Sequence, residues 1–201
     1  MSGGWTGPGS DGQTADQARH QAHVQDQSQD QDQDQAGAAN HCEALLQHTL
    51  DAIRPPLTWQ PGVPTAGRTL PPGDAAPDDP ACWYVSRNRN ILTVVSPARR
   101  GALLGVVERH WRRSGHLITS VNADHLMPGL YATTAHGYRL GLDFGTVGNA
   151  YLTATSPPVA RAERIGHPPG TPGIARHPGG PADVAPRPSA FCPFWSAGDV
   201  G

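Results

Sequence analysis

Ten histidines are the first candidates for chemistry in this chain of 201 residues, because imidazole is the commonest side-chain ligand of protein-bound metals. His41 and His48 stand seven residues apart on one expected helix, which places them two turns apart and too far from each other to share an ion. The chain has no His-x-His or His-Glu-x-x-His pair, and such short spacings are what metal sites on one element use. We therefore expect no metal site and no cofactor.

The candidate nucleophiles are equally isolated. Cys42, Cys82 and Cys192 form no Cys-x-x-Cys pair, and they are expected to be inert thiols in a reducing compartment or partners in disulfides in an exported protein. Ser114 and His116 belong to a helix end, and no Gly-x-Ser-x-Gly elbow occurs. A phosphate-binding glycine loop that leads into a helix is also missing. We expect no enzyme, and the alternative is an enzyme with an unrecognised site.

The arginines carry the strongest functional signal. All 15 basic residues are arginine, and the stretch 82–159 holds eight of them against three acidic residues. One interpretation is a solvated helix face, and the other is contact with an anionic surface or a protein partner. A nucleic acid is the weaker anionic candidate, because no pair of stacking aromatic residues accompanies the charge. The candidate contact residues are Arg99, Arg109, Arg112 and Arg113, and Arg87, Arg89 and Arg139 are expected nearby or on the open face of the sheet.

A helix must position these four arginines. Ser96 can cap its first turn, Pro97 suits the first helical position, and Gly115 can end it in the left-handed conformation. Glu108 is expected to pair with Arg112 one turn later. The opposite face of the helix is an apolar stripe, formed by Leu103, Leu104, Val107 and Trp111.

The strands follow from β-branched runs and from alternation of apolar and polar residues. A hairpin loop ends at Gly137, which is expected to have a positive φ. The predicted order is β-α-β-β-β-β, an α+β fold with one helix packed on a mostly antiparallel sheet. The helix stripe should cover the face that carries Tyr138 and Leu140. The strands are expected at 91–95, 117–121, 130–134, 138–144 and 150–155.

Composition divides the chain into five parts. Residues 1–40 form an acidic, Gln/Asp-rich tail that is expected to be disordered, and 41–54 form an amphipathic helix that starts after Asn40 and stops before Pro55. Residues 55–81 are a Pro/Gly linker, 82–159 are the α+β domain, and 160–201 are a second disordered Pro/Gly tail. The apolar run 191–195 within that tail is expected to be an isolated patch.

No apolar run is long enough to cross a membrane. The first residues show neither a basic segment nor an apolar one, so we expect no signal peptide in the chain as written and a cytoplasmic location by default.

A run from Leu92 to Trp111, followed by Ile118–Val121, Gly137-Tyr138 and Thr155-Ser156-Pro157, resembles a family of small actinobacterial proteins of uncharacterised function. Its members are often described as secreted proteins or lipoproteins, so the resemblance implies export to the cell envelope. From the residues we expect a non-catalytic interaction or cell-envelope accessory domain with a basic helix face, and the alternatives are a cytoplasmic nucleic-acid-binding module and an enzyme with an unrecognised site. Members tend to carry a cysteine where this chain has Pro158, which removes the disulfide that the resemblance would imply for Cys42 or Cys82.

Overall fold

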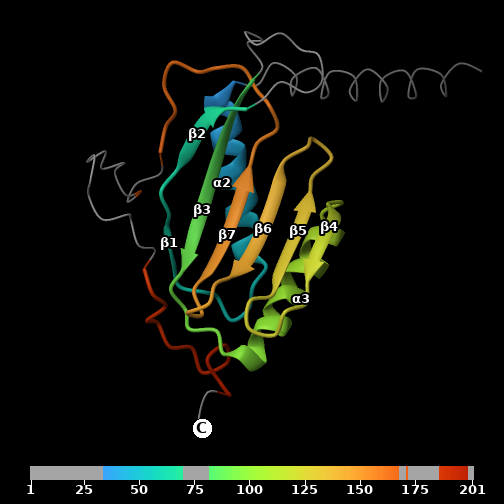
Figure 1. The fold of residues 1–201 in the computed structure, drawn as a ribbon, viewed down its shortest axis with the longest axis vertical. Coiled ribbons are helices and arrows are strands. Elements are labelled where there is room, and N and C mark those ends of the chain that lie inside the picture. The colour runs from blue at the N-terminus through green and yellow to red at the C-terminus, as the bar shows by residue number, and fades with distance from the viewer. Residues whose placement is uncertain (1–33, 70–81, 168–170, 172–185, 199–201) are drawn as a thin grey trace, which may run out of the picture. The chain divides into compact units, whose positions relative to one another are not determined.

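The computed structural model describes residues 34–69, 82–167, 171 and 186–198, and in Figure 1 they form one sheet with two helices packed against it. The predictions for 1–33, 70–81, 168–170, 172–185 and 199–201 lie outside the described residues. The elements are α2 (Gln35–Asp51), β1 (Trp59–Pro61), β2 (Thr65–Arg68), β3 (Trp83–Ile91), α3 (Pro97–Arg113), β4 (Leu117–Asn122), β5 (Gly129–Thr133), β6 (Arg139–Phe144) and β7 (Ala150–Thr155).

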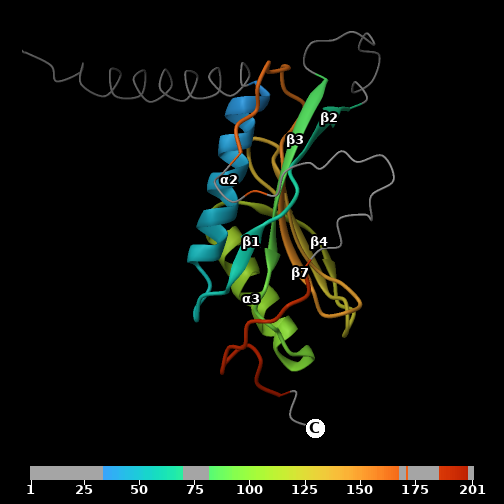
Figure 2. The same ribbon diagram turned by 90° about the vertical axis from the view of Figure 1, so that its left-hand side faces the viewer.

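The sheet is antiparallel throughout and has the strand order β1-β3-β7-β6-β5-β4, with β2 also paired to β3. Figure 2 shows both helices on the same side of it. α2 packs on β3 and β7, whereas α3 packs on β4 and β5. The fold is therefore of the α+β class, as the sequence predicts, and the other face of the sheet carries no helix among the described elements.

α3 agrees closely with the predicted helix. Its four stripe residues are buried in the same core as Tyr138 and Leu140, and Gly115 has a φ of +78°. Gly137 has a φ of +80° in the predicted hairpin loop. Ser96 is the N-cap residue, but its hydroxyl makes no capping bond and donates instead to the carbonyl of Ala197 at 2.7 Å.

α2 begins at Gln35, six residues before the predicted start. The Asp34 carboxylate accepts hydrogen bonds from the backbone N–H groups of Ala36 and Gly37 at 3.0 and 2.9 Å, which makes it the N-cap in place of Asn40. The added turn buries Ala38 and Ala39, whose small side chains let the helix approach the sheet closely. The assignment of residues 34–40 to a disordered tail was therefore wrong.

The first strand was misplaced. The predicted strand 91–95 shares only Ile91 with β3, and Leu92–Val95 form the connection to α3. β3 carries polar residues on both of its faces, so apolar periodicity does not reveal it. The predicted linker also contains regular structure, because β1 and β2 pair in succession along the outer edge of β3.

Two described stretches of the C-terminal segment, 160–167 and 186–198, belong to the domain, contrary to the prediction of a disordered tail from residue 160 onward. The first passes the start of α2, where Ala160 pairs with Asp34, and the second pairs with residues 92–96, which lead into α3. Trp195 is only 1% exposed, and its indole N–H donates to the carbonyl of Pro55 at 2.7 Å. The patch 191–195 is thus anchored in the core by one large side chain.

Replacing Trp195 with alanine should lower the free energy of unfolding by about 3–5 kcal/mol, because the substitution empties a buried site and leaves the Pro55 carbonyl without its donor. Urea denaturation monitored by circular dichroism measures the loss. Phe191→Ala is the control, since Phe191 is 74% exposed and should change stability by about 0.5 kcal/mol or less. Equal effects of the two substitutions would contradict the anchoring role.

Candidate functional site

The four arginines predicted as a contact face do not form one group. Arg99 lies in the first turn of α3, where its guanidinium stands 4.7 Å from the centre of the Phe194 ring. Arg109, Arg112 and Arg113 lie in the last turns, about 15 Å farther along a helix that rises 1.5 Å per residue. The structure therefore supports a basic end of α3, formed by Arg109, Arg112 and Arg113, and not a basic face along its whole length.

At this basic end the three guanidiniums reach into solvent. Arg112 donates from Nε and Nη2 to the Glu108 carboxylate at 3.1 and 2.8 Å, the predicted pair one turn apart. Arg113 donates from Nε to the carbonyl of Arg109 at 3.2 Å. Glu108 offsets only one of the three charges, so the basic end keeps a net positive charge.

Histidines from both helices lie beside the basic end. The ring centres of His48 on α2 and His110 on α3 are 4.7 Å apart. Burial, and then the nearby His48, Arg113 and His116, lower the pKa of His110. Burial, and then His48 and His41, lower the pKa of His116. Burial is the larger cause for both His110 and His116, and the neighbouring positive charges add to it, so each of these two imidazoles holds its proton less firmly than in water.

Metal binding finds no support at these histidines. Across residues 34–69, 82–167 and 186–198, no three His, Cys, Asp or Glu side chains converge as an ion would require. His41 stacks instead on Tyr138, with ring centres 4.4 Å apart.

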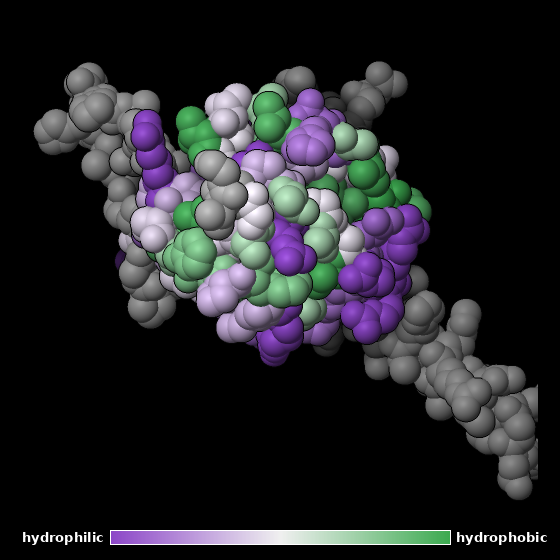
Figure 3. Space-filling view, turned by 90° about the horizontal axis from the view of Figure 1, so that it is seen from below, coloured by the Kyte–Doolittle hydropathy of each residue, from purple (hydrophilic) through white to green (hydrophobic). Residues whose placement is uncertain are grey.

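Exposed apolar side chains lie just beyond the basic end. The nearest is Leu117, which is 70% exposed and opens β4, four residues after α3 ends. Val121, 55% exposed, lies near the other end of β4, and a bulge between Ile118 and Ser120 places it on the opposite face of the sheet from Leu117. The exposed face that Figure 3 shows from below mixes hydrophobic and strongly hydrophilic residues in small patches. Among the described helices, none combines the length and the apolar character of a membrane span.

Two arginines were placed wrongly by the sequence analysis. Arg87 and Arg89 were expected near the basic helix face or on the open face of the sheet, but both point toward α2 and are 2% and 4% exposed. The carboxylate of Glu43 on α2 lies between them, 3.3 Å from Nε of Arg87 and hydrogen-bonded to Nη2 of Arg89. Their spacing of two, continued by Val85 and Ile91, is the signal that both belong to the buried face of a strand.

The thiols take no part in a site. Cys42 and Cys82 are buried, Cys192 is half-buried, and all three are free. Burial raises the pKa of Cys42 to about 12, so its thiol is protonated at neutral pH and is a poor nucleophile.

The tyrosines of the sheet do not form a stacking platform. Tyr138 is buried, whereas Tyr131 donates a hydrogen bond to the Asp143 carboxylate across the open face. This bond raises the pKa of Tyr131. Arg139 is exposed on β6, where it alternates with the buried Leu140 and so lies on the open face of the sheet, one of the two placements expected for it. It is two strands from β3, in register with Thr155 and, through it, with Ser86.

Comparison with known proteins adds little. No family model matches the chain, and none of the curated proteins matches it. Among solved structures, it is similar to a DUF4853 family protein from the actinobacterium Actinomyces odontolyticus, with 12% identity, a TM-score of 0.39, and coverage of 66% of this chain and 75% of the other. A likeness this weak carries no argument about fold or function.

Acidification should destabilise the protein through the histidines between α2 and α3. The pKa values of His110 and His116 are lower in the folded chain than in the unfolded chain, so the unfolded chain binds more protons as the pH falls below about 6.5. The stabilisation that is present above about pH 6.5 is therefore lost as the pH falls through the lower pKa values that these histidines have in the folded chain. Backbone amides lower the pKa of the exposed Asp124, which moves its titration away from this range.

Urea denaturation between about pH 7.5 and pH 5.5 measures this dependence. His110→Gln should flatten it, whereas His125→Gln, in an exposed loop, should leave it unchanged. A profile that is independent of pH, or one that both substitutions flatten equally, would refute the assignment.

Removing the Glu43 carboxylate between the buried arginines should lower the free energy of unfolding far more than removing an exposed carboxylate. Glu43→Ala leaves two buried guanidiniums without their counter-charge, so the free energy of unfolding should fall by about 3 kcal/mol or more. Asp51→Ala on the same helix removes an exposed carboxylate and should cost about 0.5 kcal/mol or less. Thermal and urea denaturation of the two variants decides the matter, and similar losses would count against the buried ion cluster.

Proposed function

We propose that this protein is a non-catalytic module that binds an anionic phospholipid surface through the basic end of α3. The observation that carries the proposal is the gathering of Arg109, Arg112 and Arg113 at one end of α3, against the single carboxylate of Glu108. Basic clusters of this kind are attracted to anionic headgroups by about 1 kcal/mol per arginine.

An exposed apolar neighbour favours a bilayer over a dissolved polyanion. Leu117 is exposed four residues after Arg113, and an interfacial surface combines cations with apolar side chains that enter the headgroup region. A nucleic acid would instead profit from aromatic stacking, and the exposed tyrosine Tyr131 is engaged with Asp143.

We propose a non-catalytic role because the candidate nucleophiles are poorly placed for catalysis. Cys42 and Cys82 are buried, and the raised pKa of Cys42 keeps its thiol protonated. Ser114, which the sequence places near His116, is the C-cap residue of α3 and not part of a nucleophile elbow.

Sedimentation with lipid vesicles tests the proposal. The protein should bind vesicles that contain phosphatidylglycerol and not vesicles of phosphatidylcholine alone, and salt should weaken the binding because it screens exposed charges.

Replacing Arg109, Arg112 and Arg113 together with alanine should weaken binding on the order of 100-fold, the equivalent of about 1 kcal/mol for each arginine. The matched control replaces Arg54, Arg164 and Arg187, three exposed arginines elsewhere, and changes the net charge by the same amount. Equal losses in both variants would overturn the site. Tighter binding of duplex DNA than of vesicles would overturn the assignment to lipid.

A further inference from the structure

A groove of about 350 Å³ lies on the far side of α2 from the basic end of α3. It is bounded by β2, by the start of α2 and by residues 161–167, the segment that follows β7 over the top of the sheet in Figure 1. Its volume falls in the range of small-molecule sites, which begins at about 300 Å³. Arg87 lies at its base, and Arg161 lies beside it with its guanidinium 4.9 Å from the centre of the Trp83 ring.

The charges beneath this groove do not balance. Arg87 and Arg89 contribute two buried positive charges, and Glu43 contributes one negative charge. Cys42 cannot supply the second, because burial raises the pKa of its thiol to about 12. The guanidinium of Arg89 also lies 4.6 Å from the centre of the Trp59 ring, which stabilises its positive charge. The uncompensated charge therefore rests on Arg87, and a buried charge is stable only when it is paired.

Arg87 also has hydrogen-bonding capacity to spare. Among the described residues, Nη1 donates to the carbonyl of Ser86 at 3.1 Å and Nη2 to the carbonyl of Gly166 at 3.0 Å. Nε is buried without a hydrogen-bond partner of good geometry. A guanidinium has five N–H donors. The two carbonyls take one each and Nε faces the Glu43 carboxylate at 3.3 Å, so one N–H on Nη1 and one on Nη2 remain for another acceptor.

We propose that the groove binds a small organic monocarboxylate, with its carboxylate on Arg87 and its apolar part against Trp83 and Ile165. One negative charge matches the excess beneath the groove, and a planar carboxylate suits the fork of a guanidinium. The rim supports this chemistry, since it pairs apolar residues with Arg161 and with an exposed carboxylate, Glu163, which disfavours a second negative charge on the ligand.

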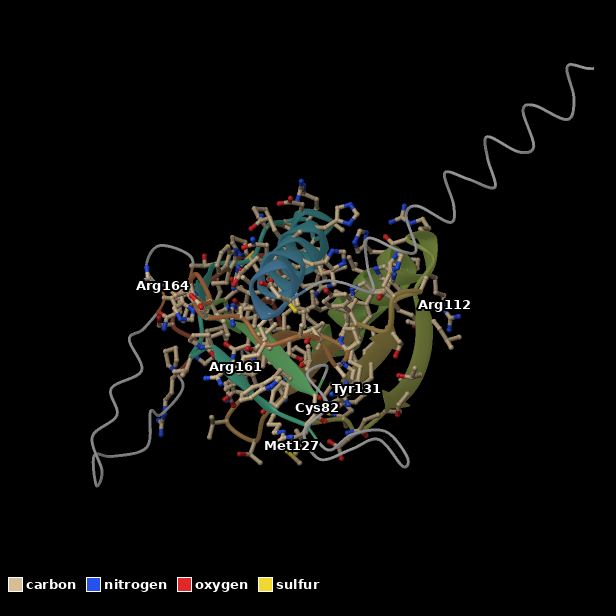
Figure 4. All side chains as sticks on the ribbon, turned by 90° about the horizontal axis from the view of Figure 1, so that it is seen from above. Cys82, Arg112, Met127, Tyr131, Arg161 and Arg164 are labelled. Atoms are coloured by element: carbon tan, nitrogen blue, oxygen red, sulfur yellow. The ribbon has the colours of Figure 1, made fainter. Side chains whose placement is uncertain are left out.

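This site is independent of the proposed lipid contact. Figure 4 places Arg112 and Arg161 on opposite sides of the domain, and no residue of the groove belongs to the basic end of α3. The failure of either proposal would leave the other standing.

Calorimetric titration and thermal denaturation test the groove with three probes of one shape: 3-phenylpropionate, its neutral amide, and phenyl phosphate. The carboxylate should bind saturably and raise the melting temperature, because a ligand that binds only the folded chain stabilises it. The amide should bind at least about tenfold more weakly, since it lacks the charge that Arg87 pairs with. No saturable binding of the carboxylate, equal binding of the amide, or tighter binding of the phosphate would overturn the proposal.

Two substitutions localise the binding. Ala66→Trp fills the groove from β2 and should abolish binding, whereas Ala102→Trp, at an exposed position on α3, should not affect it. Arg87→Lys keeps the charge but loses the fork, and should weaken binding about tenfold. Because Arg87 is buried and its variant could lose stability, the pair of tryptophan variants decides the outcome. Unchanged binding in Ala66→Trp would refute the site.

Discussion

The contact of one carboxylate with two buried guanidiniums determines where α2 lies on the sheet. Glu43 reaches from the helix to Arg87 and Arg89, which occupy alternate positions on the same face of β3. An ion cluster with little water tolerates few arrangements, because each charge must keep a partner at short range. A shift of α2 by one turn would remove Glu43 from both arginines, so electrostatics adds a specific register to the apolar packing of Leu46 and Leu50.

Both candidate sites depend on that register. Toward its C-terminal end α2 brings His48 against His110 and Thr49 against the indole N–H of Trp111, at 3.0 Å, which joins the two helices beside the basic end of α3. At its N-terminal end the side chain of Gln35 donates to the carbonyl of Tyr84 at 3.1 Å and helps to form the groove. One helix thus positions two separate cationic regions, although most of its own surface is uncharged.

The parts of the fold that the sequence predicts are those in which local preference and burial agree. α3 combines a proline at its start, a glycine at its end and one apolar stripe, and the four strands after it alternate cleanly or carry β-branched runs. β3 escapes prediction because its buried face places arginines between Val85 and Ile91. The start of α2 and the anchor Trp195 escape for a different reason: both lie in segments of biased composition, and only contacts distant in sequence hold them in the domain.

The candidate sites show the same division between local and distant causes. A run of arginines on a helix can be read from spacing alone, so Arg109, Arg112 and Arg113 were found, but Arg99 was grouped with them because the sequence does not reveal that Phe194 lies beneath its guanidinium. The groove has no local signature at all. Its proposed chemistry depends on an excess of one positive charge, which arises because α2, with the single carboxylate of Glu43, covers Arg87 and Arg89 of β3. This excess becomes buried only when α2 packs on β3. Burial changes what such a charge requires, because it lowers the pKa of Arg87 and makes an unpaired guanidinium costly, and the proposed carboxylate ligand would supply that partner.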